Sequence, residues 1–197
     1  MKAQTANGVK TMEKEVQLTD GSILLRPYRL SDAEPVYEAV RESLPELSVW
    51  LPWAHLDYSI EESRTWIALC AEMWAKGTEF NFAIFGKQND TFLGGCGLNQ
   101  VDLANHFANL GYWVRSKRTG KGIATAAALL VARFGFDKLG LNRIEIGAAT
   151  RNSASLRVAE KIGANRQGIQ KRKMAFRDKV YDRQVFSLTP KDLENRA

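Results

Sequence analysis

The sequence predicts a single α/β domain in which helices flank one mixed β-sheet. Its 197 residues suit one domain and are enough to bury a hydrophobic core. Three strand patterns follow one another between residues 80 and 114, separated by short turns. A strand–helix–strand unit comes only afterwards, over residues 108–149. A regular doubly wound fold would alternate strands and helices throughout, so a mixed sheet is the better prediction.

Capping signals, glycines and apolar spacing define the individual elements. Strands are expected at residues 22–27, 80–85, 91–100, 108–114, 143–149, 164–174 and 180–188. Helices are expected at residues 31–41, 59–77, 123–140 and 152–162. The segment 43–56 contains Pro45 and Pro52 and is expected to be irregular or to form one short turn of helix. The domain should therefore span residues 21–190, after a flexible leader over 1–20 and before a short tail over 191–197.

Three of these expectations rest on specific local signals. Ser31 and Ser59 each precede a Glu by three residues, which is the capping-box pattern of a helix start. Gly94, Gly95 and Gly97 would weaken a plain strand. A bulge or a close backbone approach is therefore expected at these glycines.

Composition excludes several classes of protein. The chain is 45% hydrophobic and 25% charged, and no apolar stretch approaches the roughly 18 residues that cross a membrane. The polar first 20 residues lack the apolar core of a signal peptide. Cys70 and Cys96 have no metal-ligand spacing and are expected to be reduced thiols. These features predict a cytoplasmic protein with no metal ion and no membrane partner.

The basic residues of the chain gather in two clusters. The net charge is +6, from 28 Lys and Arg against 22 Asp and Glu, which permits an anionic ligand without requiring one. One cluster, over residues 115–121, lies in a glycine-rich turn. The other is Lys171, Arg172 and Lys173, for which a solvated surface and a binding role both remain open.

The glycine-rich turn is the strongest chemical signal. A strand ending at Val114 leads through Gly120 and Gly122 into a helix, so the first N–H groups of that helix are available to an anion. The same glycines also fit a helix start without a ligand. A Walker loop would need Ser or Thr after Lys121, and the dinucleotide fingerprint would need Gly in place of Thr125. What remains is a pyrophosphate bound by a different kind of turn.

Several further motifs, in their order and spacing, give the chain a family resemblance. They are Leu25-Arg-Pro-Tyr-Arg-Leu-Ser-Asp32, Trp50-Leu-Pro-Trp53, Gly111-Tyr-Trp113, Gly120-Lys-Gly-Ile-Ala-Thr125, Leu141-Asn-Arg-Ile144 and Asn152-Ser-Ala-Ser-Leu-Arg-Val-Ala-Glu-Lys-Ile-Gly-Ala164. Over residues 22–188 the chain resembles the GNAT N-acetyltransferases, and within them the branch that acetylates N-termini of ribosomal proteins. The resemblance implies a mostly antiparallel sheet of about seven strands and acetyl-CoA as cosubstrate.

The resemblance also implies roles for particular residues. The pyrophosphate motif corresponds to residues 119–124, where Thr119 departs from the usual Gln or Arg and Arg118 is expected to replace it. Asn152 matches a cofactor contact, and Ser155 matches a serine near the thioester sulfur that can protonate the leaving thiolate. Helix capping is the alternative for both. The full expected cofactor site is Trp113, Val114, Arg118, Thr119, Gly120, Lys121, Gly122, Ile123, Ala124, Thr125, Asn152 and Ser155.

The general base is not evident from the sequence. Relatives place a carboxylate at one of two positions, which hold Asn109 and Ala175 here. Glu42, Glu46 and His55 are reserve candidates. Without a strong base, an α-amine is the favoured acceptor, because deprotonation at neutral pH costs about 1 kcal/mol for an α-amine and roughly 4.6 kcal/mol for a lysine.

Other readings of the sequence remain open. The acceptor is expected at the side of Trp50-Leu-Pro-Trp53, where an aromatic wall suits a peptide, a small amine or an antibiotic. A non-catalytic CoA-binding regulator would share the cofactor turn. A nucleic-acid-binding module would account for the charge, but no nucleic-acid motif is present. The sequence is compatible with a monomer or a homodimer.

Overall fold

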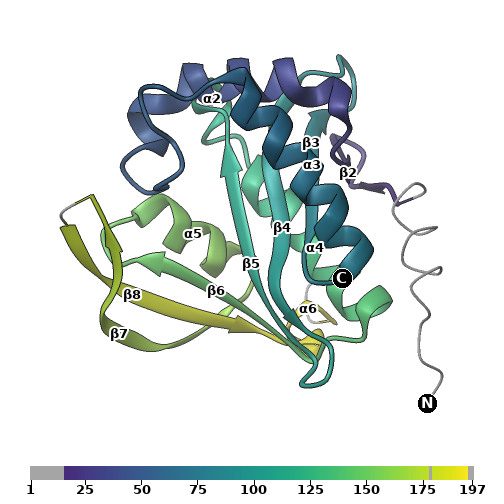
Figure 1. Ribbon diagram of the computed structural model, residues 1–197. Coiled ribbons are helices and arrows are strands. Elements are labelled where there is room, and N and C mark those ends of the chain that lie inside the picture. Colours follow the sequence, from purple (N-terminus) through teal and green to yellow (C-terminus); the bar gives the residue numbers. More distant parts are fainter. Residues whose placement is uncertain (1–15, 178, 195–197) are drawn as a thin grey trace.

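An eight-stranded sheet forms the centre of the protein. A computed structural model describes residues 16–177 and 179–194, and its strands lie in the order β1-β2-β3-β4-β5-β6-β8-β7 (Figure 1). The strands are β1 (Leu18–Thr19), β2 (Ile23–Pro27), β3 (Phe80–Gly86), β4 (Phe92–Asp102), β5 (Phe107–Val114), β6 (Arg143–Ala149), β7 (Asn165–Phe176) and β8 (Lys179–Leu188). The helices are α2 (Ala33–Leu47), α3 (Ile60–Lys76), α4 (Ile123–Leu139), α5 (Ser153–Lys161) and α6 (Pro190–Glu194), with short 3-10 turns η1 (Leu30–Asp32) and η2 (Ser116–Arg118).

The sheet is mixed and mostly antiparallel, as predicted. Only β5 and β6 pair in parallel among the described strands. The strand that the sequence did not indicate is β1, in which Leu18 and Thr19 pair with β2. These two residues fall within the expected leader, whose residues 1–15 lie outside the described part of the chain. Leu193 of the expected tail is buried in α6, and residues 195–197 again lie outside the described part.

Helices cover both faces of the sheet. On one face, α2 buries Val36, Val40 and Leu44 against Phe85 and Phe92. On the other face, α4 and α5 pack against side chains of β3 to β6 and β8 in the larger core cluster. The strand alternation therefore assigns each side chain of β5 and β6 to one helical layer or the other.

The first long helix differs from its prediction at both ends. Ser31 does not cap it; instead Asp32 accepts a backbone hydrogen bond from Arg29 (2.7 Å) and a bidentate ion pair from Arg26 (2.8 Å for each bond). The helix also continues to Leu47 through Pro45, so part of the expected irregular segment is helical. Burial of the last turn against the core outweighs the lost hydrogen bond of the proline.

The other local signals are confirmed. Ser59 caps α3 in a reciprocal box with Glu62, and Gly77 ends this helix with a left-handed φ of 69°. The pairing of β3 with β4 shifts its register where β4 passes Gly94, and a Cβ on that glycine would lie 2.2 Å from the Trp113 carbonyl oxygen. The glycine allows β5 to approach closely just before the chain enters the glycine-rich turn.

Candidate active site

A gap in the sheet creates the site. β5 and β6 pair only from Phe107 to Asn109 and from Arg143 to Glu145, although both strands continue further. Beyond these pairs, residues 110–114 remain hydrogen-bonded to β4 on one side and, among the described residues, have no strand partner on the other. Their free backbone groups face the opening between the two strands.

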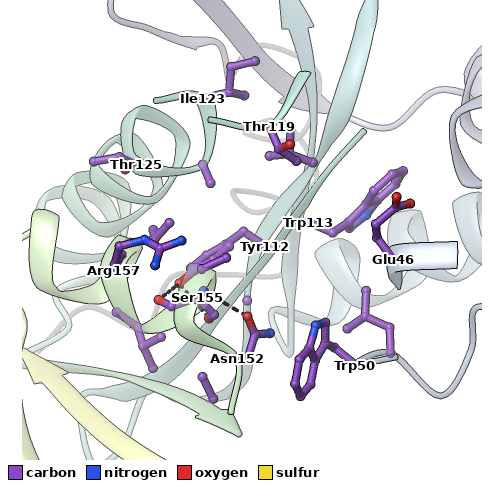
Figure 2. Close-up of a pocket in the computed structure, with 18 of the residues that line it drawn as sticks. Glu46, Trp50, Tyr112, Trp113, Thr119, Ile123, Thr125, Asn152, Ser155 and Arg157 are labelled. Atoms are coloured by element: carbon purple, nitrogen blue, oxygen red, sulfur yellow. Dashed lines mark hydrogen bonds between the residues drawn. The ribbon is translucent and has the colours of Figure 1, made fainter. Parts of the chain in front are cut away.

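A cavity of about 590 Å³ occupies this opening. Residues from both faces of the sheet line it: Tyr112 and Ile146 from the face of α4 and α5, and Gly111, Trp113 and Gly147 from the face of α2. Figure 2 shows side chains from β5, α2, α4 and α5 around one space. The cavity thus joins the two sides of the sheet, so two different molecules can meet in it.

The start of α4 has the geometry of an anion site and borders the cavity. Gly120 and Gly122 have left-handed φ values of 76° and 80°, and no side chain in the described part of the chain caps the helix. Ile123, Ala124 and Thr125 of the first turn line the cavity. Uncapped N–H groups at the positive end of a helix bind phosphate oxygens, and the glycines remove the Cβ atoms that would stand in the way.

The predicted cofactor residues converge on this cavity, with one exception. Trp113, Val114, Arg118, Thr119, Gly120, Gly122, Ile123, Ala124, Thr125, Asn152 and Ser155 all line it. Lys121 is exposed and does not line it, so it can act only through its backbone or through long-range charge.

Two cationic residues in the lining were missed in the sequence. Arg157 and Lys161 lie one turn apart on α5 and both line the cavity. They follow the Asn-Ser-Ala-Ser motif at helical spacing, so the motif could have indicated them. With Arg118 they add positive charge to the lining of the cavity.

Asn152 and Ser155 occupy the start of α5. The Asn152 side-chain oxygen accepts a hydrogen bond from the Ser155 N–H (3.1 Å), so Asn152 does cap the helix while also lining the cavity. The Ser155 hydroxyl lies 3.1 Å from the Tyr112 hydroxyl, which also donates to the Ser155 carbonyl oxygen (3.0 Å) (Figure 2). Because the phenol proton goes to that carbonyl, the serine proton can turn to another acceptor in the cavity.

Tyr112 is a further residue that the sequence analysis missed. Burial raises the pKa of its phenol to about 12, with the hydrogen bond to Ser155 acting in the opposite direction. The phenol therefore keeps its proton throughout the physiological range. The available signal was the alternation of side chains along the strand that contains Gly111-Tyr-Trp113. This alternation places Tyr112 and Trp113 on opposite faces of the sheet.

An aromatic wall closes the other side of the cavity. Trp50 and Leu51 of the segment after α2 line it together with Trp113 and Met174. Trp50 packs edge-on against Tyr181 of β8, with ring centroids 6.1 Å apart. The turn of the β7–β8 hairpin is fastened to the same segment, since Arg177 donates to the Ala54 carbonyl oxygen (2.6 Å).

The reserve base candidates have different positions. The hydrogen bond from Arg115 (2.8 Å) lowers the pKa of Glu42 to about 2, with Lys117 contributing, so Glu42 stays ionised in an ion pair. His55 contacts Glu62 (2.8 Å) and does not line the cavity. Glu46 does line it, and it accepts a hydrogen bond from the Ser116 hydroxyl (2.7 Å).

The two positions that lack the expected carboxylate lie just outside the cavity lining. Asn109 donates to Gln100, while its side-chain oxygen is buried without a partner among the described residues. In register with Asn109 on β6 is Glu145, whose carboxylate is held by Arg143 (2.8 Å). Ala175 is exposed on β7, next to Met174.

Cys70 and Cys96 are buried free thiols, and burial raises the pKa of both. Within residues 16–177 and 179–194, no group of three or more His, Cys, Asp or Glu side chains could hold a metal ion. No helix of that part is long and apolar enough to cross a membrane.

Comparison with known proteins identifies the fold around this cavity. The sequence model of the acetyltransferase (GNAT) domain matches residues 22–165. The chain belongs to the GNAT acetyltransferase family. It is similar to a Bacillus subtilis protein named "Probable N-acetyltransferase YjcK", with 32% identity over 177 residues, covering 88% of this chain and 97% of the relative. It is therefore an N-acetyltransferase that uses acetyl-CoA.

Two more distant likenesses involve ribosomal proteins. The Escherichia coli ribosomal-protein-serine acetyltransferase is 24% identical over 161 residues, which is 82% of this chain and 88% of that protein. RimL, a ribosomal L7/L12 alpha-N-protein acetyltransferase in complex with coenzyme A, has a TM-score of 0.82 at 20% identity. It covers 88% of this chain and 98% of its own. The second likeness shows the fold alone.

The geometry of the cavity suits the coenzyme. A pyrophosphate needs several N–H donors in a space without side chains, which the start of α4 offers at Gly120 and Gly122. An extended amide arm needs a free strand edge, which β5 offers beyond Asn109. Both features border one cavity, which extends to the aromatic wall on the opposite face.

Proposed function

We propose that this N-acetyltransferase acetylates the N-terminal α-amine of a protein or peptide, by direct attack within a ternary complex. The observation that carries the proposal is the cavity that joins the two faces of the sheet, with anion-binding features on one side and an aromatic wall on the other. Two substrates entering from opposite faces meet at the split between β5 and β6. The relative named ribosomal-protein-serine acetyltransferase supports a protein N-terminus as acceptor.

The cofactor side holds the thioester. The N–H groups of residues 123–125 bind the pyrophosphate, Arg118, Arg157 and Lys161 supply positive charge, and the free edge of β5 at Trp113 and Val114 pairs with the pantetheine arm. Acetyl-CoA supplies the acetyl thioester, whose carbonyl carbon the amine attacks.

Ser155 acts on the leaving group. As the new C–N bond forms and the C–S bond breaks, the Ser155 hydroxyl donates its proton to the thiolate, and the surplus proton of the amine passes through water to restore the Ser155 hydroxyl. Tyr112 positions Ser155, because its phenol proton engages the Ser155 carbonyl oxygen. A thiol with a pKa comparable to the ~8.5 of cysteine needs only a modest donor.

The class of acceptor follows from the free energy needed to deprotonate its amine. Neither Asn109 nor Ala175 can take a proton. An α-amine is deprotonated at neutral pH for about 1 kcal/mol, whereas a lysine side chain costs about 3.6 kcal/mol more. Buried free cysteines further support a reducing compartment, and we place the reaction in the cytoplasm.

Two matched peptides test the acceptor. One has a free N-terminus and an acetylated lysine, and the other has an acetylated N-terminus and a free lysine. We expect kcat/KM for the first to exceed that for the second by at least tenfold at pH 7, measured by thiol release and located by mass spectrometry. Equal rates would mean that a base deprotonates the lysine, with Glu46 and Glu145 as the first candidates. Faster turnover of an amino acid, polyamine or aminoglycoside would overturn the peptide acceptor.

A further inference from the structure

The hairpin of β7 and β8 carries most of the protein's charge excess. Residues 165–188 contain seven Lys and Arg and two Asp, which is a net charge of +5 in a chain whose total is +6. β7 forms the outer edge of the sheet, and most of its residues are exposed. A surface that only needed to be soluble would mix both signs of charge.

A bulge presents three of these cations in succession. The pairing of β7 with β8 is interrupted between Gln170 and Met174, and Arg172 has a left-handed φ of 52°. Asp182 on β8 closes the bulge, since it accepts the Arg172 N–H (2.9 Å) and the Lys171 ammonium (2.9 Å). The bulge is therefore a built feature, in which one carboxylate fixes a strained backbone and pairs with Lys171, while Arg172 and Lys173 are exposed on the strand.

The basic bulge lies beside the acceptor side of the active site. Met174, which follows Lys173 directly, lines the cavity. Tyr181 of β8 packs against Trp50 of the aromatic wall and also borders a second hollow of about 360 Å³. That hollow contains two more cations, Arg151 and Lys179. A chain leaving the acceptor mouth can thus pass directly over cationic side chains.

We propose that this basic rim, defined as Arg151, Lys171, Arg172, Lys173 and Lys179, binds acidic side chains of the acceptor polypeptide. The inference rests on the proposed peptide acceptor and names its class: a polypeptide whose N-terminal residue is followed by Asp and Glu. At about 3.3–3.6 Å per extended residue, acceptor positions three to eight span roughly 20 Å of chain beyond the mouth. Charge complementarity of this kind steers association and selects among acceptors.

An acidic polypeptide fits the rim better than a nucleic acid does. Proteins that bind single strands offer free aromatic faces for base stacking. The aromatic rings of this hairpin are already engaged, because Phe176 stacks on Tyr181 at 4.7 Å and Tyr181 contacts Trp50. The rim supplies charge next to a peptide-sized mouth, without a stacking platform.

The test compares two acceptor peptides on three proteins. The peptides share their first two residues and differ only in Glu or Gln at positions three to eight. The proteins are the wild type, the rim variant Arg172→Gln with Lys173→Gln, and a matched control, Arg133→Gln with Lys138→Gln. The control removes the same charge from exposed positions of α4, none of which lines the cavity.

We expect the wild type to favour the Glu peptide at least tenfold in kcat/KM at low salt, since each exposed ion pair contributes a factor of about two to five. The preference should shrink at 0.5 M salt. The rim variant should lose most of its preference for the Glu peptide, while its kcat/KM for the Gln peptide stays within threefold of the wild-type value. The control variant should keep the preference.

Four results would overturn the inference. Equal wild-type rates on both peptides would overturn the role of the rim, but the proposed peptide acceptor would stand. An undiminished preference in the rim variant would place the acidic contacts elsewhere. Salt-sensitive binding of RNA that the rim variant loses, without any preference between the peptides, would assign the rim to nucleic acid. If neither peptide is acetylated while a small amine is, the proposed function itself fails, and the inference fails with it.

Discussion

Replacing Ser155 by Ala is the sharpest test of the leaving-group step. Its hydroxyl lies in the cavity at the start of α5, 3.1 Å from the Tyr112 hydroxyl. Alanine removes the proposed proton donor and keeps the helix, because the Asn152 cap is bonded to the Ser155 backbone N–H, which alanine retains. Catalysis can therefore change without a change in fold.

The expected loss is 10- to 100-fold in kcat. General acid catalysis commonly contributes 10²–10⁴-fold, and a thiolate of pKa ~8.5 is a good leaving group that needs the least help. The loss corresponds to about 1.4–2.7 kcal/mol in the barrier. Coenzyme A affinity should change less than threefold, because the substitution leaves the proposed phosphate contacts at the start of α4 in place.

Tyr112→Phe serves as the companion variant. It removes the hydrogen bond to the Ser155 carbonyl, which is worth about 0.5–1.5 kcal/mol, so we expect a two- to tenfold loss in kcat. With burial raising the pKa of Tyr112 to about 12, the phenol should create no limb in the pH–rate profile between pH 6 and 9. The double variant should be little worse than Ser155→Ala, as expected when both residues act in one step.

The assay measures thiol release under saturating acetyl-CoA, with coenzyme A affinity from calorimetry and the melting temperature as a check on folding. A wild-type kcat in Ser155→Ala would reduce Ser155 to a structural position at the start of the helix. A larger loss in Tyr112→Phe than in Ser155→Ala would identify the phenol as the donor. Either result would refute the assignment of the proton to Ser155.

Two further perturbations follow from the backbone and from the ion pair behind the cofactor turn. Gly122→Val should reduce coenzyme A affinity more than tenfold in calorimetry. Gly140→Val is the matched control, because both glycines have left-handed φ values (80° and 69°) and Gly140 lies at the far end of α4. Each substitution should lower the free energy of unfolding by a similar ~1–2 kcal/mol. Gly140→Val should leave the coenzyme A affinity unchanged, and equal affinities in the two variants would move the phosphate site away from this turn. Glu42, whose pKa Arg115 lowers from 4.5 to about 2, stabilises the fold fully above about pH 5 and loses this effect as the pH falls toward 2. This pKa shift is equivalent to roughly 3 kcal/mol before solvent screening. Glu42→Gln should therefore lower the free energy of unfolding, measured in urea, by about 1 kcal/mol at pH 7 and by almost nothing at pH 2. A loss of stability that does not depend on pH would argue against the ion pair.

The local elements could be read from the sequence because neighbouring residues determine them. Ser59 with Glu62, Gly77, and the glycines of the turn before α4 act within a few positions of the chain, and all behave as the sequence predicts. The order and spacing of longer motifs identified the family, and all but one of the residues predicted to bind the cofactor line a single cavity. The end of α2 was mispredicted, because a proline signal was outweighed by the burial of Leu44 and Leu47 in a core formed with distant strands.

The sequence by itself therefore determined the mixed sheet, the glycine turn and the acetyl-CoA chemistry. Only the tertiary structure decided how the site is completed, because the contacts that do so join residues far apart in the chain. Tyr112 meets Ser155 across 43 positions and Arg115 pairs with Glu42 across 73. The pairing of β5 with β6 stops at Asn109, and the β7–β8 hairpin folds back beside Trp50. Strand register and burial set these contacts, and both depend on the whole packed sheet, whereas capping and turn signals act locally.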